Sequence, residues 1–238
     1  NYQGGTLRVG NIEADGLSDL VYAVSNSAGT SFTWHYKLHS GVVPDLVSSI
    51  TDGMGNFVRF QFASLASGAP LYTKGNSAQY PVQDVQPTMQ VVSTFTQSDG
   101  IGGSYNLAYA YSGAQLDPKG RGFLGFATVT TTDSRNSNQD TVTYDQVFPW
   151  IGQVTNDVVM LSGSGGYFEI QGSNKNGPDY IRYGSGYLSR YFPYFDATVA
   201  HEYDPASVPA GTQGSQVRKT VSSLAASVNN QSSVSFDA

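Results

Sequence analysis

The feature that most constrains the fold is a strand–turn–strand pattern at residues 46–62. Apolar and polar residues alternate along Phe57–Phe62, as they do in a β-strand with one buried face. The stretch before it, residues 52–56, is rich in Gly and Asn, as hairpin turns are. A looser copy of the same design covers residues 126–145. The sequence therefore predicts an antiparallel sheet that grows hairpin by hairpin, with residues 46–50 paired to Phe57–Phe62.

Composition favours an all-β fold and argues against several functions. The chain has 27 Gly, 16 Tyr, 12 Phe and three Glu, so aromatic and turn residues replace the usual helix formers. The net charge of −6 comes mostly from Asp, a residue typical of turns. The 12 Lys and Arg residues form no cluster, which argues against nucleic acid as a partner. Cys is absent, and no run of 18 apolar residues predicts a membrane span.

Residues 10–23 indicate a loop that wraps a hard cation, with Ca²⁺ as the candidate cofactor. Oxygen-bearing residues recur around Gly16, which permits a sharp turn with positive φ. The residues predicted to bind the metal are four side chains and one backbone carbonyl: Asn11, Glu13, Asp15, Asp19 and the carbonyl of Leu17. The alternative is an Asx-rich turn that closes a hairpin without an ion. The apolar run at residues 20–23 is predicted to be the strand that leaves the loop.

This loop resembles the FG-GAP repeat of β-propeller proteins, whose pattern is Asp-x-Asn-x-Asp-Gly-x-x-Asp. Two positions depart from the pattern, because Asn11 replaces the first Asp and Glu13 replaces the Asn. The resemblance implies that residues 1–40 are the end of an FG-GAP-like propeller region. A single propeller blade cannot bury its own faces, so the chain is expected to be a fragment of a larger protein.

The hairpin at residues 46–62 resembles the Rhs/YD repeat, with a Phe pair where the repeat has a Tyr pair. Two glycine-rich segments, Ser98–Gly103 and Gly120–Phe126, make the likeness more specific. Together these motifs are similar to the shell region of the Tc insecticidal toxin B component and its Rhs relatives, over about residues 10–155. The resemblance implies that residues 41–238 are the beginning of an Rhs/YD-repeat-like β-shell.

Such shells curl a long β-sheet around a hollow interior that holds a C-terminal toxin polypeptide. The resemblance therefore implies a non-catalytic structural role, in a protein that is secreted by or extracellular to a bacterium. Its partners would be the rest of the same shell, the toxin cargo and a partner subunit of the toxin complex. The alternative is a secreted or cell-surface β-rich binding module whose aromatic side chains contact glycan or protein. A wall-acting hydrolase is a weaker third hypothesis, because the few Glu residues lie in no telling context.

No catalytic residue is predicted, and no cofactor-binding residue apart from those of the cation loop. His35 and His39 have no third ligand nearby in the sequence, which favours ordinary surface histidines over a zinc site. Arg121 lies between two glycines, and it is either bonded to a carboxylate such as Asp117 or placed on the surface. Phe126, like the Phe three residues before it, is predicted to anchor the sheet through burial of its ring.

Overall fold

Strands account for nearly all the regular structure of this chain. The computed structural model describes residues 6–162 and, beyond them, strand segments at 167–173, 180–183, 190–193, 197–203, 216–223, 225–228 and 234–237. These residues form antiparallel sheets, and the helical structure among them is one 3₁₀ turn, η1 (Leu65–Ser67). The predicted all-β class is confirmed. The chain divides into two compact units, unit 1 (residues 1–73 and 86–104) and unit 2 (residues 74–85 and 105–238).

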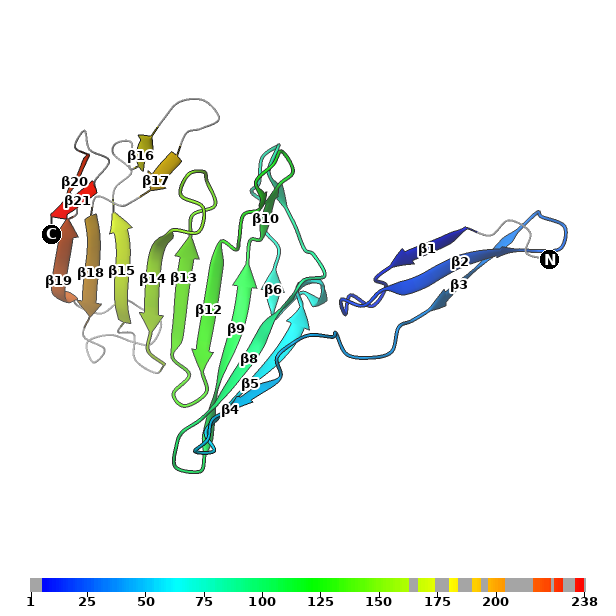
Figure 1. Cartoon of the computed structure of the whole chain (residues 1–238), viewed down its shortest axis with the longest axis horizontal. Helices are drawn as coiled ribbons and strands as arrows, with labels where there is room; N and C mark the ends of the chain where they lie inside the picture. Colours follow the sequence, from blue (N-terminus) through cyan, green and yellow to red (C-terminus); the bar gives the residue numbers. More distant parts are fainter. Residues whose placement is uncertain are drawn as a thin grey trace. The chain divides into compact units, whose positions relative to one another are not determined.

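Unit 1 begins with a three-stranded antiparallel sheet in the order β1-β2-β3 (Figure 1). Its strands are β1 (Leu7–Gly10), β2 (Asp19–Ser25) and β3 (Phe32–Lys37). The ring of Tyr22 stacks on that of its cross-strand partner His35 at a centroid distance of 5.3 Å. The strand predicted at residues 20–23 is confirmed as part of β2. Every residue of β3 is exposed.

The second sheet of unit 1 contains the hairpin predicted at residues 46–62. Its strands, in the order of the sheet, are β4 (Ser49–Thr51), β5 (Phe57–Ser64) and β8 (Gln90–Ser98). Ile50 is paired with Val58, and Phe60 N–H donates to the carbonyl of Ser48 at 2.9 Å. The predicted antiparallel pairing is confirmed. The strand itself begins at Ser49.

Unit 2 contains a longer run of antiparallel strands (Figure 1). In the order of the sheet they are β9 (Ser104–Ser112), β12 (Thr128–Asp133), β13 (Gln139–Tyr144), β14 (Val154–Met160), β15 (Tyr167–Ser173), β18 (Ala197–Tyr203) and β19 (Gln216–Ser223). The hairpin predicted at residues 126–145 is β12 paired with β13. β12 pairs with β13, β13 with β14 and β14 with β15, so this part of the sheet is built by successive hairpins.

Shorter strands complete both units. They are β6 (Tyr72–Thr73) in unit 1, and β7 (Gln83–Asp84), β10 (Gln115–Asp117), β11 (Gly122–Phe123), β16 (Tyr180–Tyr183), β17 (Arg190–Pro193), β20 (Ala225–Val228) and β21 (Val234–Asp237) in unit 2. β7, β10 and β11 form a small sheet of their own.

The most deeply buried apolar side chains lie beside the strand ends rather than across the sheets. In unit 1 they are Leu65 in η1, with no exposed surface, and Tyr72, which is 2% exposed. In unit 2 they are Ala114 and Leu124, at 0% and 4% exposed. Every residue of β12 is by contrast only half-buried. No residue of β9, β12, β13 or β14 is fully buried, so this part of the unit 2 sheet is a single layer with both faces partly open.

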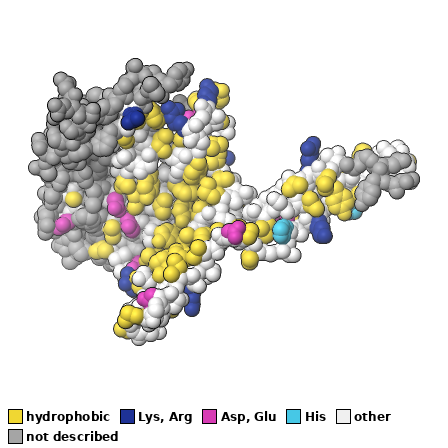
Figure 2. All heavy atoms as spheres, viewed as in Figure 1, with side chains coloured by type: hydrophobic (Ala, Val, Ile, Leu, Met, Phe, Trp, Pro, Cys, Tyr) yellow, Lys and Arg dark blue, Asp and Glu magenta, His cyan; other side chains and the backbone are white. Residues whose placement is uncertain are grey.

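The two faces of this layer differ in chemistry. The register gathers apolar and aromatic residues on one face of β9, β12, β13 and β14, which we call the apolar face: Leu107, Tyr109, Tyr111, Val129, Val142 and Val159. Four polar residues share this face: Thr131, Asp133, Asp140 and Asp157. The opposite face, which we call the hydroxyl face, carries Ser112, Thr128, Thr130, Thr132, Thr141 and Thr143. Its apolar residues are Ala108, Ala110, Val158 and Met160. Figure 2 shows hydrophobic side chains gathered over β9, β12 and β13.

Candidate functional site

The predicted cation loop is closed by the carboxylate of Asp19. This side chain is 1% exposed, and its two oxygens accept hydrogen bonds from the N–H groups of Ile12 at 2.7 Å and His39 at 2.8 Å. The bonds from His39 and Ile12 hold the pKa of Asp19 below its ordinary value, since amide donors favour the charged form. Asp19 thus ties together the start of the loop and the segment that follows β3.

The other end of the loop is fixed by Asp15 and Gly16. The Asp15 carboxylate accepts from Leu17 N–H at 2.8 Å, and its backbone carbonyl accepts from the Gln90 side chain at 2.5 Å. Gly16 has the predicted positive φ, at 92°, and a Cβ there would lie 2.6 Å from Gln90 Nε2. A larger residue at this position would therefore displace Gln90 as well as strain the backbone.

The remaining predicted ligands do not complete a cluster of acidic groups. Asn11 has side-chain nitrogen and oxygen atoms that are buried without a hydrogen-bond partner. In the part of the chain that the structure describes, no three His, Cys, Asp or Glu side chains lie close enough together to hold a metal ion. The loop has the geometry of an Asx-type turn closed by its own amides. Calcium binding at Asn11, Glu13, Asp15, Leu17 and Asp19 stays a prediction.

The same turn chemistry recurs along the chain. Aspartate carboxylates accept the N–H two residues further on, at 2.8–2.9 Å, and the residues that do so are Asp15, Asp52, Asp99, Asp117, Asp133 and Asp145. Asp99 also accepts from Gly103, which makes the predicted glycine-rich segment at 100–103 a tight turn. These bonds explain why a chain of this composition carries its negative charge on Asp.

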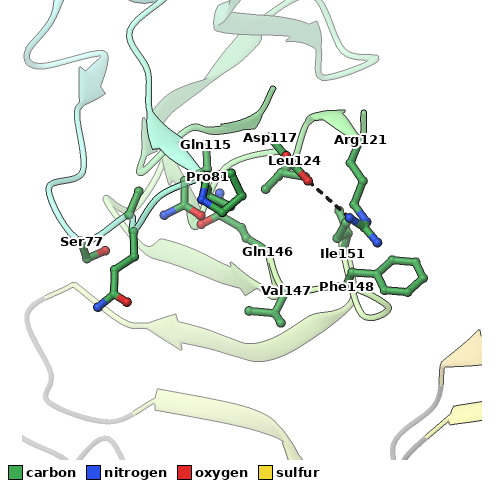
Figure 3. Close-up of a pocket in the computed structure, with 13 residues that line it drawn as sticks. Ser77, Pro81, Gln115, Asp117, Arg121, Leu124, Gln146, Val147, Phe148 and Ile151 are labelled. Carbon is green, nitrogen blue, oxygen red and sulfur yellow. Dashed lines mark hydrogen bonds and ion pairs between the residues drawn. The ribbon is translucent and has the colours of Figure 1, made fainter. Parts of the chain in front are cut away.

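A second candidate site is a cavity of about 480 Å³ among the loops of unit 2 (Figure 3). Asp117, which is 5% exposed, accepts from Arg121 at 3.4 Å, and the Arg121 guanidinium lies 4.2 Å from the Phe148 ring centroid. The Arg121 side chain remains 47% exposed, so it is both bonded to Asp117 and on the surface. Gln146 donates to the carbonyls of Gly113 and Gly125, each at 2.8 Å. These polar groups join the loops to one another.

The two Phe residues predicted to anchor the sheet through burial of their rings differ in depth. The Phe126 ring is half-buried and packs on Tyr111, with ring centroids 4.8 Å apart. Phe123 is 39% exposed, and the side chain buried between them in sequence is Leu124, at 4% exposed. Sequence reasoning missed Leu124, because the positive φ of Gly122 and Gly125 turns the chain and breaks the strand alternation on which the prediction relied.

Comparison with known families decides the family. The model for the insecticide toxin TcdB middle/N-terminal region matches residues 2–148. The chain belongs to this family. The resemblance to the Tc toxin B component is thereby confirmed, and the matched residues cover most of the range, about 10–155, over which the motifs indicated it. A search of curated proteins finds no match. Among the described residues, no helix is long and apolar enough to cross a membrane.

Proposed function

We propose that this chain forms part of the wall of a shell that encloses a C-terminal toxin polypeptide. The observation that carries the proposal is the hairpin-built single layer in a chain of the TcdB middle/N-terminal family. A sheet that adds strands by successive hairpins can be extended to any length, which suits a wall. The role is structural and requires no catalytic group.

The difference in chemistry between the two faces indicates which face of the wall points toward the enclosed polypeptide. Hydroxyl groups on the hydroxyl face hydrogen-bond to one another, at 3.1 Å between Thr130 and Thr141 and at 2.5 Å between Ser112 and Thr128, and such groups are suited to contact with water. Covering the apolar face is favourable, by about 25 cal/mol per Å² of apolar surface removed from water. We therefore place the apolar face toward the enclosed polypeptide and the hydroxyl face toward solvent.

The sheet β1-β2-β3 supports a propeller that extends beyond this chain. On one face Phe32, Trp34 and Tyr36 are 59%, 64% and 67% exposed. On the other face Tyr22 and Val24 are 39% and 45% exposed. A sheet that is apolar on both faces needs a neighbour on each, as a propeller blade has. We propose that residues 1–40 end an FG-GAP-like propeller and that residues 41–238 begin the Rhs/YD-type shell.

The partners and location follow from the same proposal. The chain would contact the remainder of its own shell, the enclosed toxin and a partner subunit of the toxin complex. A toxin that acts on another organism leaves the bacterium that makes it, so the proposed location is secreted or extracellular.

Cysteine labelling tests this assignment. The chain has no Cys, so a single thiol introduced at Val129 or Thr130 is unique within it. These neighbours on β12 are both half-buried and lie on opposite faces. In the assembled toxin, Val129→Cys is expected to react with a maleimide at least about tenfold more slowly than Thr130→Cys, and to react at the same rate after denaturation.

The second candidate function, a β-rich module that binds glycan or protein, is favoured by the exposed rings of Phe32, Trp34 and Tyr36. It predicts that both thiols react at similar rates, since neither face of β12 would be enclosed. Equal rates in the assembled toxin would therefore contradict the shell and favour the binding module.

A further inference from the structure

Two carboxyl groups are neighbours on the apolar face of the unit 2 sheet. Asp140 on β13 is paired with Val159, and Asp157 on β14 is paired with Val142. Residues directly opposite each other, and residues two apart along a strand, share a face. The two aspartates are therefore diagonal neighbours, and their side chains lie close enough to hydrogen-bond each other.

The strands around this pair supply no positive charge. β9, β12, β13, β14 and β15 contain no Lys or Arg. The next backbone partners outward are Thr131 on β12 and Ile170 on β15. The Oδ1 atom of each carboxyl is buried with no hydrogen-bond partner. An ionised pair would thus lack both a counter-charge on these strands and full solvation.

Other ionisable groups occur on the same face. They are Tyr105, Tyr109 and Tyr111 on β9, Asp133 on β12, Tyr144 on β13, Glu202 on β18 and Arg218 on β19. Burial, with a smaller contribution from Tyr109, raises the pKa of Tyr111 to about 12, so this ring is neutral near pH 7. The Asp133 carboxylate accepts a hydrogen bond from Arg135 at 2.6 Å, so the positive charge of Arg135 is paired with Asp133. Glu202 on β18 is paired with Phe168 on β15 and, on its other side, with Arg218 on β19, so a basic residue stands opposite this acidic one.

Two carboxylates this close cannot both ionise at low cost, and one proton shared between them relieves the repulsion. We propose that Asp140 and Asp157 form a proton-sharing pair that fastens β13 to β14 in mild acid and loosens this part of the sheet when both carboxyls ionise. The pair is a property of the sheet itself, so its test does not depend on the shell.

The sign of the pH dependence follows from linkage. Burial first, and then the bond and charge of Asp157, raise the pKa of Asp140 from 3.8 to about 6. A raised pKa in the folded state contributes stability that is fully present below 3.8 and is lost as the pH rises through about 6. If local unfolding of the sheet exposes Asp140 to solvent, the equilibrium constant for that unfolding should rise about tenfold between about pH 5 and about pH 7.5.

Hydrogen exchange of the full chain at these two pH values tests the proposal. After correction for intrinsic exchange, amides in residues 139–160 should be about tenfold less protected at the higher pH. The double variant Asp140→Asn with Asp157→Asn keeps the side-chain shapes and removes the shared proton, so its change should fall below about twofold. A control variant, Asp99→Asn in a turn of unit 1, should keep the full change. Protection independent of pH, or a double variant with the same dependence, would overturn the proposal.

Carboxyl ¹³C shifts of the unmodified chain give a second measurement that needs no variant. We expect the Asp140 carboxyl to titrate near pH 6. Two independent titrations near 3.8 would show that no proton is shared.

Discussion

At the scale of single residues, burial rather than aromatic character decides which side chains anchor the unit 2 loops. Leu124 is 4% exposed, whereas Phe123 is 39% exposed and Phe126 is half-buried. The free energy of a large-to-small substitution depends on the contacts and cavity that the side chain leaves behind. Leu124→Ala is expected to cost about 2–5 kcal/mol, Phe126→Ala about 2 kcal/mol, and Phe123→Ala about 1 kcal/mol or less.

Denaturant titration of the three variants checks this order. Because the chain has two units, the transition should be followed by a probe that reports unit 2, such as exchange of amides in the 113–127 segment. A cost for Phe123→Ala equal to that for Leu124→Ala would mean that the exposed ring, and not the buried leucine, holds the loop.

The cation loop gives a second prediction at this scale. We propose that Ca²⁺ is bound by Asn11, Glu13, Asp15 and the Leu17 carbonyl, with Asp19 as the remaining candidate ligand. Excess Ca²⁺ should then raise the melting temperature relative to chelator, and Asp15→Ala should abolish that increment. Asp15→Ala also removes the bond from Leu17 N–H, so the increments and not the absolute melting temperatures are compared. The same melting temperature with Ca²⁺ and with chelator would show that the loop is an Asx-type turn that binds no Ca²⁺.

At the scale of elements, the hairpins depend on aspartates in their turns. The Asp52 carboxylate accepts from Met54 N–H, Asn56 N–H and the Asn56 side chain, each at 2.9 Å. The side chain of Asn56, followed by Met54 N–H, lowers the pKa of Asp52 below 3.8. A lowered pKa contributes stability that is present above 3.8 and is lost as the pH falls through the folded value.

Asp52→Ala should therefore abolish the protection of the Met54 and Asn56 amides at every pH, by exchange measured with NMR. Asp52→Asn is the matched control, since it keeps an acceptor oxygen and loses the charge. Its Met54 and Asn56 amides should stay protected, and this protection should not decrease as the pH falls. Unchanged protection in Asp52→Ala would show that the turn is held by backbone bonds alone, such as the one from Gly55 N–H to the carbonyl of Asp52.

The elements that sequence predicted well are those set by local chemistry. Strand alternation and turn residues at 46–62 and 126–145 determine both hairpins, because register follows from the turn and from the apolar face. The cation loop is different, since a spacing of oxygen ligands does not reveal that Ile12 and His39 donate to Asp19. The carboxyl pair on β13 and β14 was not foreseen, because it depends on the register between two strands rather than on any motif.

At the scale of the whole molecule, the central claim is that the apolar face of unit 2 faces an enclosed polypeptide. Val142 and Thr141 are adjacent, half-buried residues of β13 on opposite faces, so they form a matched pair. A photoreactive amino acid at either position, in the toxin assembled with its cargo, reports what lies against each face.

Illumination followed by mass spectrometry of the adducts is the most direct measurement. The shell predicts that the probe at position 142 crosslinks to peptides of the enclosed toxin and that the probe at position 141 does not. Toxin adducts at 141 alone would reverse the orientation of the wall, and equal adducts at both positions, or none at 142, would contradict enclosure by this face.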